Sequence, residues 1–353
     1  MKSLVSLFLI LFLPLAFKGS IPSFILQGSA SSVDSLIQIS EKSSDNHERI
    51  VANNHLGIYY ESISNYKLAI QHLYAADKLN SSFDANERII TYNYLGYVFW
   101  HKSDYKMALY YHNTALKIAG DSSIVNSNLA FTYLMTGGDY YDLGDYERTS
   151  EFYFKALKQY EKLNDDVGRL MAHNRLSKLY YKLKDLQRSK EQANRAQQIN
   201  SHVGYIRETA VSFNCLGNVY IESGATDSAL HYFKKTLFYF KKSGDVIGQA
   251  IASINLGDTY FQQYKKSKLE SDLEEAYLNY QMSYMLNSRV DNKFGMIYGL
   301  WGVADIDAGR GNTELALKNY HKALTLSRSI NAKSEQYNLY QKIYILHEEK
   351  GQT

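Results

Sequence analysis

The stretch SFNCLGNVYIESGATDSALHYFKKTLFYF, from Ser212 to Phe240, decides the fold. Its first half places three residues on one face of a helix: Leu216, Gly217 and Tyr220. The residues Gly224 to Asp227 then mark a turn. Its second half spaces apolar residues four apart: Ala229, Phe233 and Leu237. The stretch therefore predicts two helices joined by a short turn.

The same pattern recurs along the chain with a period of roughly 40 residues. A small residue on the predicted second helix marks each copy: Ala69, Ala108, Thr149, Ser189, Ala229, Ala276 and Ala316. The predicted first helices carry a small residue at one position: Gly57, Gly96, Gly137, Ser177, Gly217 and Gly257. A glycine inside a helix costs about 1 kcal/mol against alanine, so its recurrence predicts that a neighbouring helix passes close by. The seventh copy has Val303-Ala304 instead, and the extra residues near Lys265 to Ser271 in the sixth are expected to lengthen its turn.

These positions resemble the tetratricopeptide repeat (TPR): Leu-Gly, an aromatic residue three positions later, a turn such as Gly144-Asp145-Tyr146, and small residues seven apart such as Ala69 and Ala76. The 40-residue spacing is similar to that of the long-repeat type of TPR, which includes MalT-like repeat regions. The chain also resembles the exported sensor region of Bacteroidetes TPR regulators. The resemblance implies an all-α fold, a right-handed α-solenoid of stacked antiparallel helix pairs. Only Pro14 and Pro22 could interrupt helices.

Four segments follow from this pattern. Residues 1–30 form a signal peptide or an N-terminal anchor, and residues 31–49 form a flanking helix. Residues 50–330 form seven helix-pair repeats, and residues 331–353 form a terminal single helix. The terminal helix has apolar residues on more than one side, including Tyr340, Ile343 and Tyr344. It is therefore either a cap or the first half of a further repeat.

The first residues, MKSLVSLFLILFLPLAF, read as an export signal with Gly28-Ser29-Ala30 as a cleavage site. The alternative is an uncleaved anchor in the inner membrane formed by residues 4–26. Both predict a periplasmic or secreted body, with membrane contact only through the N-terminal segment.

Composition excludes several classes of function. The net charge of +3 comes from 39 basic and 36 acidic residues that are well mixed, so no nucleic-acid partner is expected. Cys215 is the only cysteine, which excludes an intrachain disulfide and a cysteine-based metal site. His112 falls in a core-facing position and is expected to be structural. We expect no enzyme activity, no catalytic residues, no metal and no cofactor.

One recurrence goes beyond packing. Asparagine stands three residues before the small position in four copies: Asn54, Asn93, Asn174 and Asn214. In tetratricopeptide repeats this position and the next turn line a concave groove, where this chain also has Tyr97, Trp100, Lys178, Tyr181 and Asn218. Amides can bond an extended peptide backbone, so these residues are candidates for a peptide-binding groove. The alternative is that the asparagines bond to one another and only stabilise the stack.

The leading functional prediction is a non-enzymatic scaffold outside the cytoplasm that binds a protein or peptide segment in this groove. The alternative is the sensory module of a two-component or helix-turn-helix regulator whose membrane and output parts lie elsewhere. The sequence does not specify an oligomeric state.

Overall fold

The computed structural model describes residues 30–351 apart from residues 64, 81–84, 103 and 121–125. The predicted export segment, residues 1–30, lies almost wholly outside the described residues. The described residues form helices and no strands, which confirms the all-α prediction. The chain divides into two compact units at Tyr205 and Ile206, called here the N-terminal unit and the C-terminal unit.

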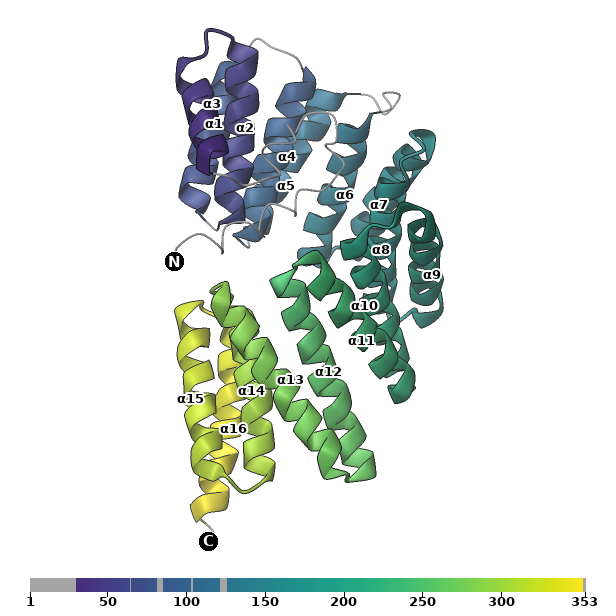
Figure 1. Ribbon diagram of the computed structural model, residues 1–353, viewed down its shortest axis with the longest axis vertical. Helices are drawn as coiled ribbons and strands as arrows, with labels where there is room; N and C mark the ends of the chain where they lie inside the picture. The colour runs from purple at the N-terminus through teal and green to yellow at the C-terminus, as the bar shows by residue number, and fades with distance from the viewer. Residues whose placement is uncertain (1–29, 64, 81–84, 103, 121–125, 352–353) are drawn as a thin grey trace. The chain divides into compact units, whose positions relative to one another are not determined.

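The N-terminal unit contains nine helices in its described part (Figure 1). They are α1 (Ala30–Lys42), α2 (Asn46–Ser62), α3 (Tyr66–Leu79), α4 (Ala85–His101), α5 (Tyr105–Ala119), α6 (Ser127–Asp142), α7 (Tyr146–Lys162), α8 (Asp166–Lys182) and α9 (Leu186–Val203). Helix α1 packs on α2 through Leu36. The next eight helices form four antiparallel pairs, each made of a first helix (even number) and a second helix (odd number).

The C-terminal unit contains the remaining helices of the described chain. They are α10 (Ile206–Glu222), α11 (Thr226–Ser243), α12 (Val246–Ser267), α13 (Glu270–Arg289), α14 (Lys293–Gly309), α15 (Thr313–Ser329) and α16 (Lys333–Gly351). They form three further pairs and then a single helix. Within each unit, consecutive first helices lie next to one another, as the stacking of an α-solenoid requires.

The turns between paired helices are short because they use left-handed backbone and side-chain caps. Gly144 and Gly224 have φ of 83° and 77°, which glycine adopts without strain. Asp104 and Asp145 accept hydrogen bonds from the backbone N–H groups of Met107 and Arg148, at the starts of α5 and α7. Each second helix is thereby started immediately after the first one ends.

The small position of the first helices lies against the second helix of the same pair. A Cβ atom added to Gly57 would lie 2.5 Å from Leu73, and one added to Gly217 would lie 2.4 Å from Phe233. These distances are too short for any side chain, so the close approach expected from the recurring glycine is present. The core of each pair is built around this contact.

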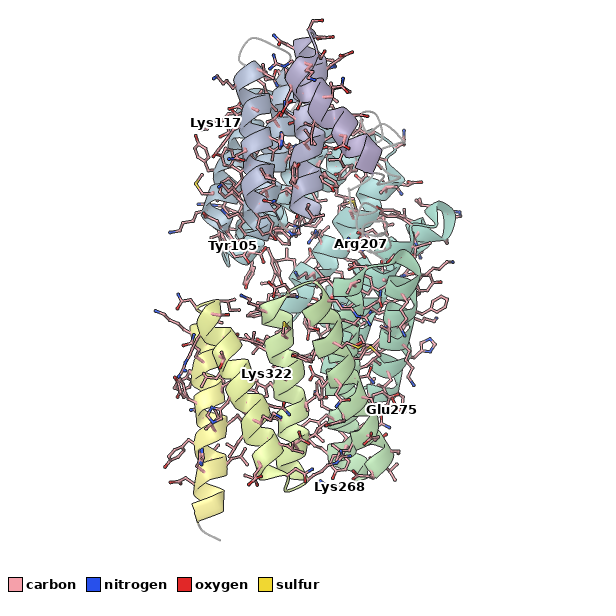
Figure 2. The ribbon with its side chains drawn as sticks, turned by 60° about the vertical axis from the view of Figure 1, so that its left-hand side comes forward. Tyr105, Lys117, Arg207, Lys268, Glu275 and Lys322 are labelled. Carbon is pink, nitrogen blue, oxygen red and sulfur yellow. The ribbon has the colours of Figure 1, made fainter. Side chains whose placement is uncertain are left out.

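The extra residues of the sixth pair do not lengthen the turn, contrary to expectation. They extend the helices, so that α12 has 22 residues and α13 has 20, against 17 and 18 in α10 and α11. Only Lys268 and Leu269 separate the two helices, and Figure 2 labels Lys268 at this turn. Lys268 adopts left-handed backbone with φ of 56°. Lysine, leucine and glutamate in this segment are good helix formers, which explains the result.

The terminal helix α16 has one buried side and one exposed side. Leu339, Ile343 and Leu346 pack into the core formed with α14 and α15. Three tyrosines on its other side are exposed: Tyr337, Tyr340 and Tyr344. Lys333 begins α16 as Lys293 begins α14, so Tyr344 stands at the position that Ala304 has in α14.

Candidate functional site

Three of the four predicted asparagines are buried. Asn54 in α2, Asn93 in α4 and Asn174 in α8 have almost no exposed surface. Asn214 in α10 is half-buried. The four side chains therefore lie at the junctions between helices rather than on an open surface.

Hydrogen bonds join these asparagines to the next first helix. The Thr91 hydroxyl on α4 donates to Oδ1 of Asn54 at 3.0 Å. The Nδ2 group of Asn255 on α12 donates to Oδ1 of Asn214 at 2.8 Å. The Asn93 amide reaches the backbone carbonyl of Asn128 on α6 at 3.5 Å. None of these partners is another of the four predicted asparagines, so these bonds differ from the expected contact of the asparagines with one another, although they also join consecutive first helices.

The accessible predicted residues lie at the next turn of the first helices. The residue that follows the small position, called here the plus-one residue, is Tyr97 in α4, Lys178 in α8 and Asn218 in α10. Lys178 is exposed, and its ammonium lies 4.7 Å from the ring centroid of Tyr141 on α6. Such a cation–π contact holds the lysine stem along the surface and keeps its charge at the solvent.

Trp100 and Tyr181 lie one turn beyond the plus-one residues and are partly exposed. The Nε1–H of Trp100 donates to Oδ2 of Asp142 on α6 at 2.6 Å, which fixes the indole ring across two first helices. Aromatic rings held in this way can bind apolar groups with little loss of conformational freedom.

Glu61 is a buried carboxyl group at the edge of this surface. Its Oε1 atom lies 3.3 Å from Nδ1 of His101, and the His101 ring packs 4.5 Å from that of Tyr97. Burial raises the pKa of Glu61 to about 7. A carboxyl group that titrates near neutral pH therefore lies beside the predicted residue Tyr97.

The C-terminal unit places two carboxylates among the plus-one residues, and neither is among the binding residues expected from the sequence. Asp258 in α12 accepts a hydrogen bond from the Tyr280 hydroxyl at 2.7 Å. Asp305 in α14 accepts one from the Tyr320 hydroxyl and lies 3.0 Å from the Lys342 ammonium on α16. The signal was present in Leu256-Gly257-Asp258, where an aspartate follows the small residue directly.

His112, for which the sequence predicted a structural role, is completely buried. Its Nδ1 atom lies 2.5 Å from Oδ2 of Asp139 on α6, and neither side chain has exposed surface. The ring occupies the place that Leu73 and Phe233 take under the glycines of other pairs. No solvent or substrate can reach this pair, so its role is in packing.

The described residues contain no group of three His, Cys, Asp or Glu side chains that could hold a metal ion. Among these residues there is also no helix with the length and hydropathy needed to cross a membrane.

Known proteins that are similar to this chain are found by structure and not by sequence. No family model matches the sequence, and no curated protein matches it. The apo form of RapI is 21% identical with a TM-score of 0.61, over 80% of this chain and 99% of that one. A Rap protein complexed with competence and sporulation factor is 11% identical with a TM-score of 0.61, over 93% of this chain and 94% of that one.

A third similar structure is a signal transduction ATPase with a tetratricopeptide repeat sensor from Pyrococcus horikoshii. It is 14% identical with a TM-score of 0.51, over 91% of this chain and 52% of that one. These likenesses show the fold, which is that of the TPR-type helical repeat proteins. The expected resemblance to the tetratricopeptide repeat is thereby confirmed at the level of the fold.

Proposed function

We propose that the protein is a non-enzymatic scaffold that binds a protein or peptide segment along the exposed face of its first helices. One observation carries this proposal. Aromatic or charged side chains stand at the plus-one position or one turn further in α4 and α8. Tyr97, Trp100 and Lys178 remain partly or fully exposed although their neighbours Leu95 and Leu176 are buried. Packing of the stack does not require such residues there.

The similar Rap structure supports the same reading, since that protein is complexed with competence and sporulation factor. A stack of first helices offers a long surface, and rigid aromatic side chains on it supply contact area at low entropic cost. The buried asparagines contribute to this proposal indirectly, because they fix the spacing between the first helices that carry the exposed residues.

Site-specific crosslinking tests the proposal. Benzoylphenylalanine placed at Tyr181 on α8 is expected to crosslink a partner in the cells that make this protein, and Lys178→Glu is expected to abolish the crosslink. Tyr110, which is exposed on the second helix α5, is the matched control position. Equal crosslinking from Tyr181 and Tyr110, or none from Tyr181, would contradict the proposal.

The proposal includes a location outside the cytoplasm, which rests on residues 1–30 of the sequence. Fusing residues 1–40 to a leaderless alkaline phosphatase is expected to give active enzyme, because that enzyme forms its disulfides only after export. The mass of the purified protein then distinguishes cleavage after Ala30 from a retained anchor. An inactive fusion would contradict the location.

A second candidate is the sensory module of a signalling regulator whose output lies on a partner. The similar structure of a signal transduction ATPase with a repeat sensor favours it. This candidate predicts that the crosslinked partner of Tyr181 carries a kinase or DNA-binding domain, which mass spectrometry of the crosslinked product would identify.

A further inference from the structure

The first helices α12 and α14 present an apolar surface to solvent. Ile247 and Ile251 on α12 are 47% and 48% exposed, and Phe294 and Tyr298 on α14 are 49% and 38% exposed. Residues four apart on a helix share a face, so each helix contributes one pair to this surface, called here the α12–α14 face. Solvent-exposed apolar side chains grouped in this way mark interaction surfaces.

The aromatic part of this face is rigid. The ring of Phe294 lies 5.2 Å from that of Tyr298, and the Tyr298 ring stacks on Trp301 at 6.3 Å. The Tyr298 hydroxyl donates to Oε1 of Glu335 on α16 at 3.0 Å. The ring is therefore held in place before any partner arrives, which lowers the entropic cost of binding.

Two carboxylates continue the face along both helices. Asp258 follows Ile251, and Asp305 follows Tyr298, after two helical turns, so each aspartate lies on the same side as the apolar residue. Tyrosine hydroxyls from the second helices hold both carboxylates: Tyr280 holds Asp258, and Tyr320 holds Asp305. The two sites are repeats of one arrangement.

The Asp258 site and the Asp305 site differ in one respect: only Asp305 has a lysine from the next first helix beside it. Asp305 pairs with Lys342, which comes from the next first helix, α16. The residue of α14 at the same helix position as Lys342 is Gly302, because α14 and α16 begin at Lys293 and Lys333. A Cβ atom at Gly302 would lie 2.4 Å from the Tyr280 ring, so no lysine can stand there.

Asp258 is therefore an exposed carboxylate without the cation that its counterpart has. The nearest positive charge on its own helix is Lys265, whose ammonium lies 4.4 Å over the Phe261 ring, and no described cation forms an ion pair with Asp258. Desolvation by the surrounding protein raises the pKa of Asp258 and the charge of Asp305 raises it further, while the Tyr280 hydroxyl and the charge of Lys265 act in the opposite direction. A cation placed beside Asp258 would form the ion pair that Lys342 forms with Asp305.

We propose that the α12–α14 face binds a partner segment in which one lysine or arginine side chain is flanked by apolar side chains. The cation takes at Asp258 the place that Lys342 takes at Asp305. The apolar side chains cover Ile251 and Tyr298. This inference rests on the proposed scaffold function and specifies which helices bind and what chemistry they select.

Selection from a random dodecapeptide library displayed on phage tests the inference, with the full chain as target. Enriched peptides are expected to contain one lysine or arginine among apolar residues. Their synthetic forms are expected to bind Asp258→Asn protein about ten-fold more weakly than the unaltered protein. Tyr298→Ser is expected to weaken the binding of the same peptides.

Glu275→Gln is the matched control, because Glu275 is an exposed carboxylate on the second helix α13 of the same pair (Figure 2). It is expected to leave binding unchanged. Replacing the basic residue of the peptide by glutamine should weaken binding to the unaltered protein and not to Asp258→Asn, which separates a direct charge pair from a general loss of folding.

Each remaining outcome would overturn the inference. Enrichment of acidic or purely apolar peptides would do so, as would equal binding by Asp258→Asn or no enrichment at all. Enriched peptides that depend on Lys178 and not on Asp258 would leave the scaffold function standing and refute this site. An Asp258-dependent dimer in light scattering would show that a second copy of the chain covers the face instead.

Discussion

Nδ1 of His112 lies 2.5 Å from Oδ2 of Asp139, and both side chains are sealed from solvent between α5 and α6. At the first contact of the stack both places are apolar: Leu73 corresponds to His112 and Val98 corresponds to Asp139. A buried polar pair thus stands where Leu73 and Val98 form an apolar contact. Burial raises the pKa of Asp139, because it disfavours the charged carboxylate.

Asp139→Leu alone is expected to lower the free energy of unfolding of the N-terminal unit by about 3 kcal/mol, since it leaves His112 buried without its partner. The double variant His112→Leu with Asp139→Leu restores the apolar pattern of the first contact of the stack. It is expected to recover most of that loss. Urea unfolding followed by Trp100 fluorescence in a Trp301→Phe background measures this unit by itself. A double variant as unstable as the single one would contradict the argument.

Glu61→Gln is expected to flatten the dependence of stability on pH. The pKa of Glu61 is raised by burial from 4.5 to about 7, so the folded state holds this proton more tightly than the unfolded state does. The stabilisation is complete below pH 4.5 and is lost as pH rises through about 7, a change of roughly 3 kcal/mol. Unfolding free energies at pH 5 and pH 8, compared between the two proteins, check this. His101→Gln is the control, because His101 contacts Glu61 from a partly exposed position.

The adjacent glycines Gly137 and Gly138 in α6 are expected to respond in opposite directions to alanine. A Cβ atom at Gly137 would lie 2.5 Å from the Tyr153 ring, so Gly137→Ala should destabilise the unit by about 1–3 kcal/mol. Nothing lies within 4 Å of a Cβ atom at Gly138. Gly138→Ala should therefore stabilise the helix by roughly 0.5–1 kcal/mol. Thermal unfolding of the two variants under one condition would show whether the signs differ.

Substituting the asparagines separates the two roles considered for them. Asn54 is buried and accepts the Thr91 hydroxyl, so Asn54→Ala is expected to cost about 1–3 kcal/mol of stability. Asn218 is a plus-one residue that is half-exposed, and Asn218→Ala is expected to change stability by less than about 0.5 kcal/mol. If urea unfolding showed equal losses of stability for Asn54→Ala and Asn218→Ala, burial would not distinguish the asparagine positions from the plus-one positions.

The repeat could be predicted from the sequence because helix packing imposes a local rule. A second helix that passes against Gly57 or Gly217 allows no side chain there, and a glycine or another small residue marks the same position in the other copies. The direction of the asparagine row could not be predicted in the same way. Asn54 and Asn174 occupy the same position along the helix as a groove residue would, and their burial depends on how neighbouring helices pack around them, which no local pattern specifies.

Pairings between residues far apart in the chain could not be predicted from the sequence either. His112 and Asp139 lie on helices of different pairs, and no local pattern connects them. The sequence shows that Asp258 and Asp305 come directly after the small position. It does not show that tyrosines on the second helices donate hydrogen bonds to them. The difference between the two sites depends on Gly302 and Lys342, whose equivalence is seen only when the starts of α14 and α16 are known.

The lengthened pair α12 and α13 shows how such a chain can evolve by insertion. Seven residues amount to about two helical turns, so an insertion of that length adds roughly one turn to each antiparallel helix. The buried stripe of α13 then keeps its orientation, and Ala276 still meets the first helix as Ala229 does in the preceding pair. An insertion of three or four residues would lengthen only one of the two helices by about a turn, and the added turn would have no partner on the other helix. Natural variation in length at this hairpin is therefore expected in steps of about seven residues, which deep sequencing of a random insertion library selected for folding would reveal.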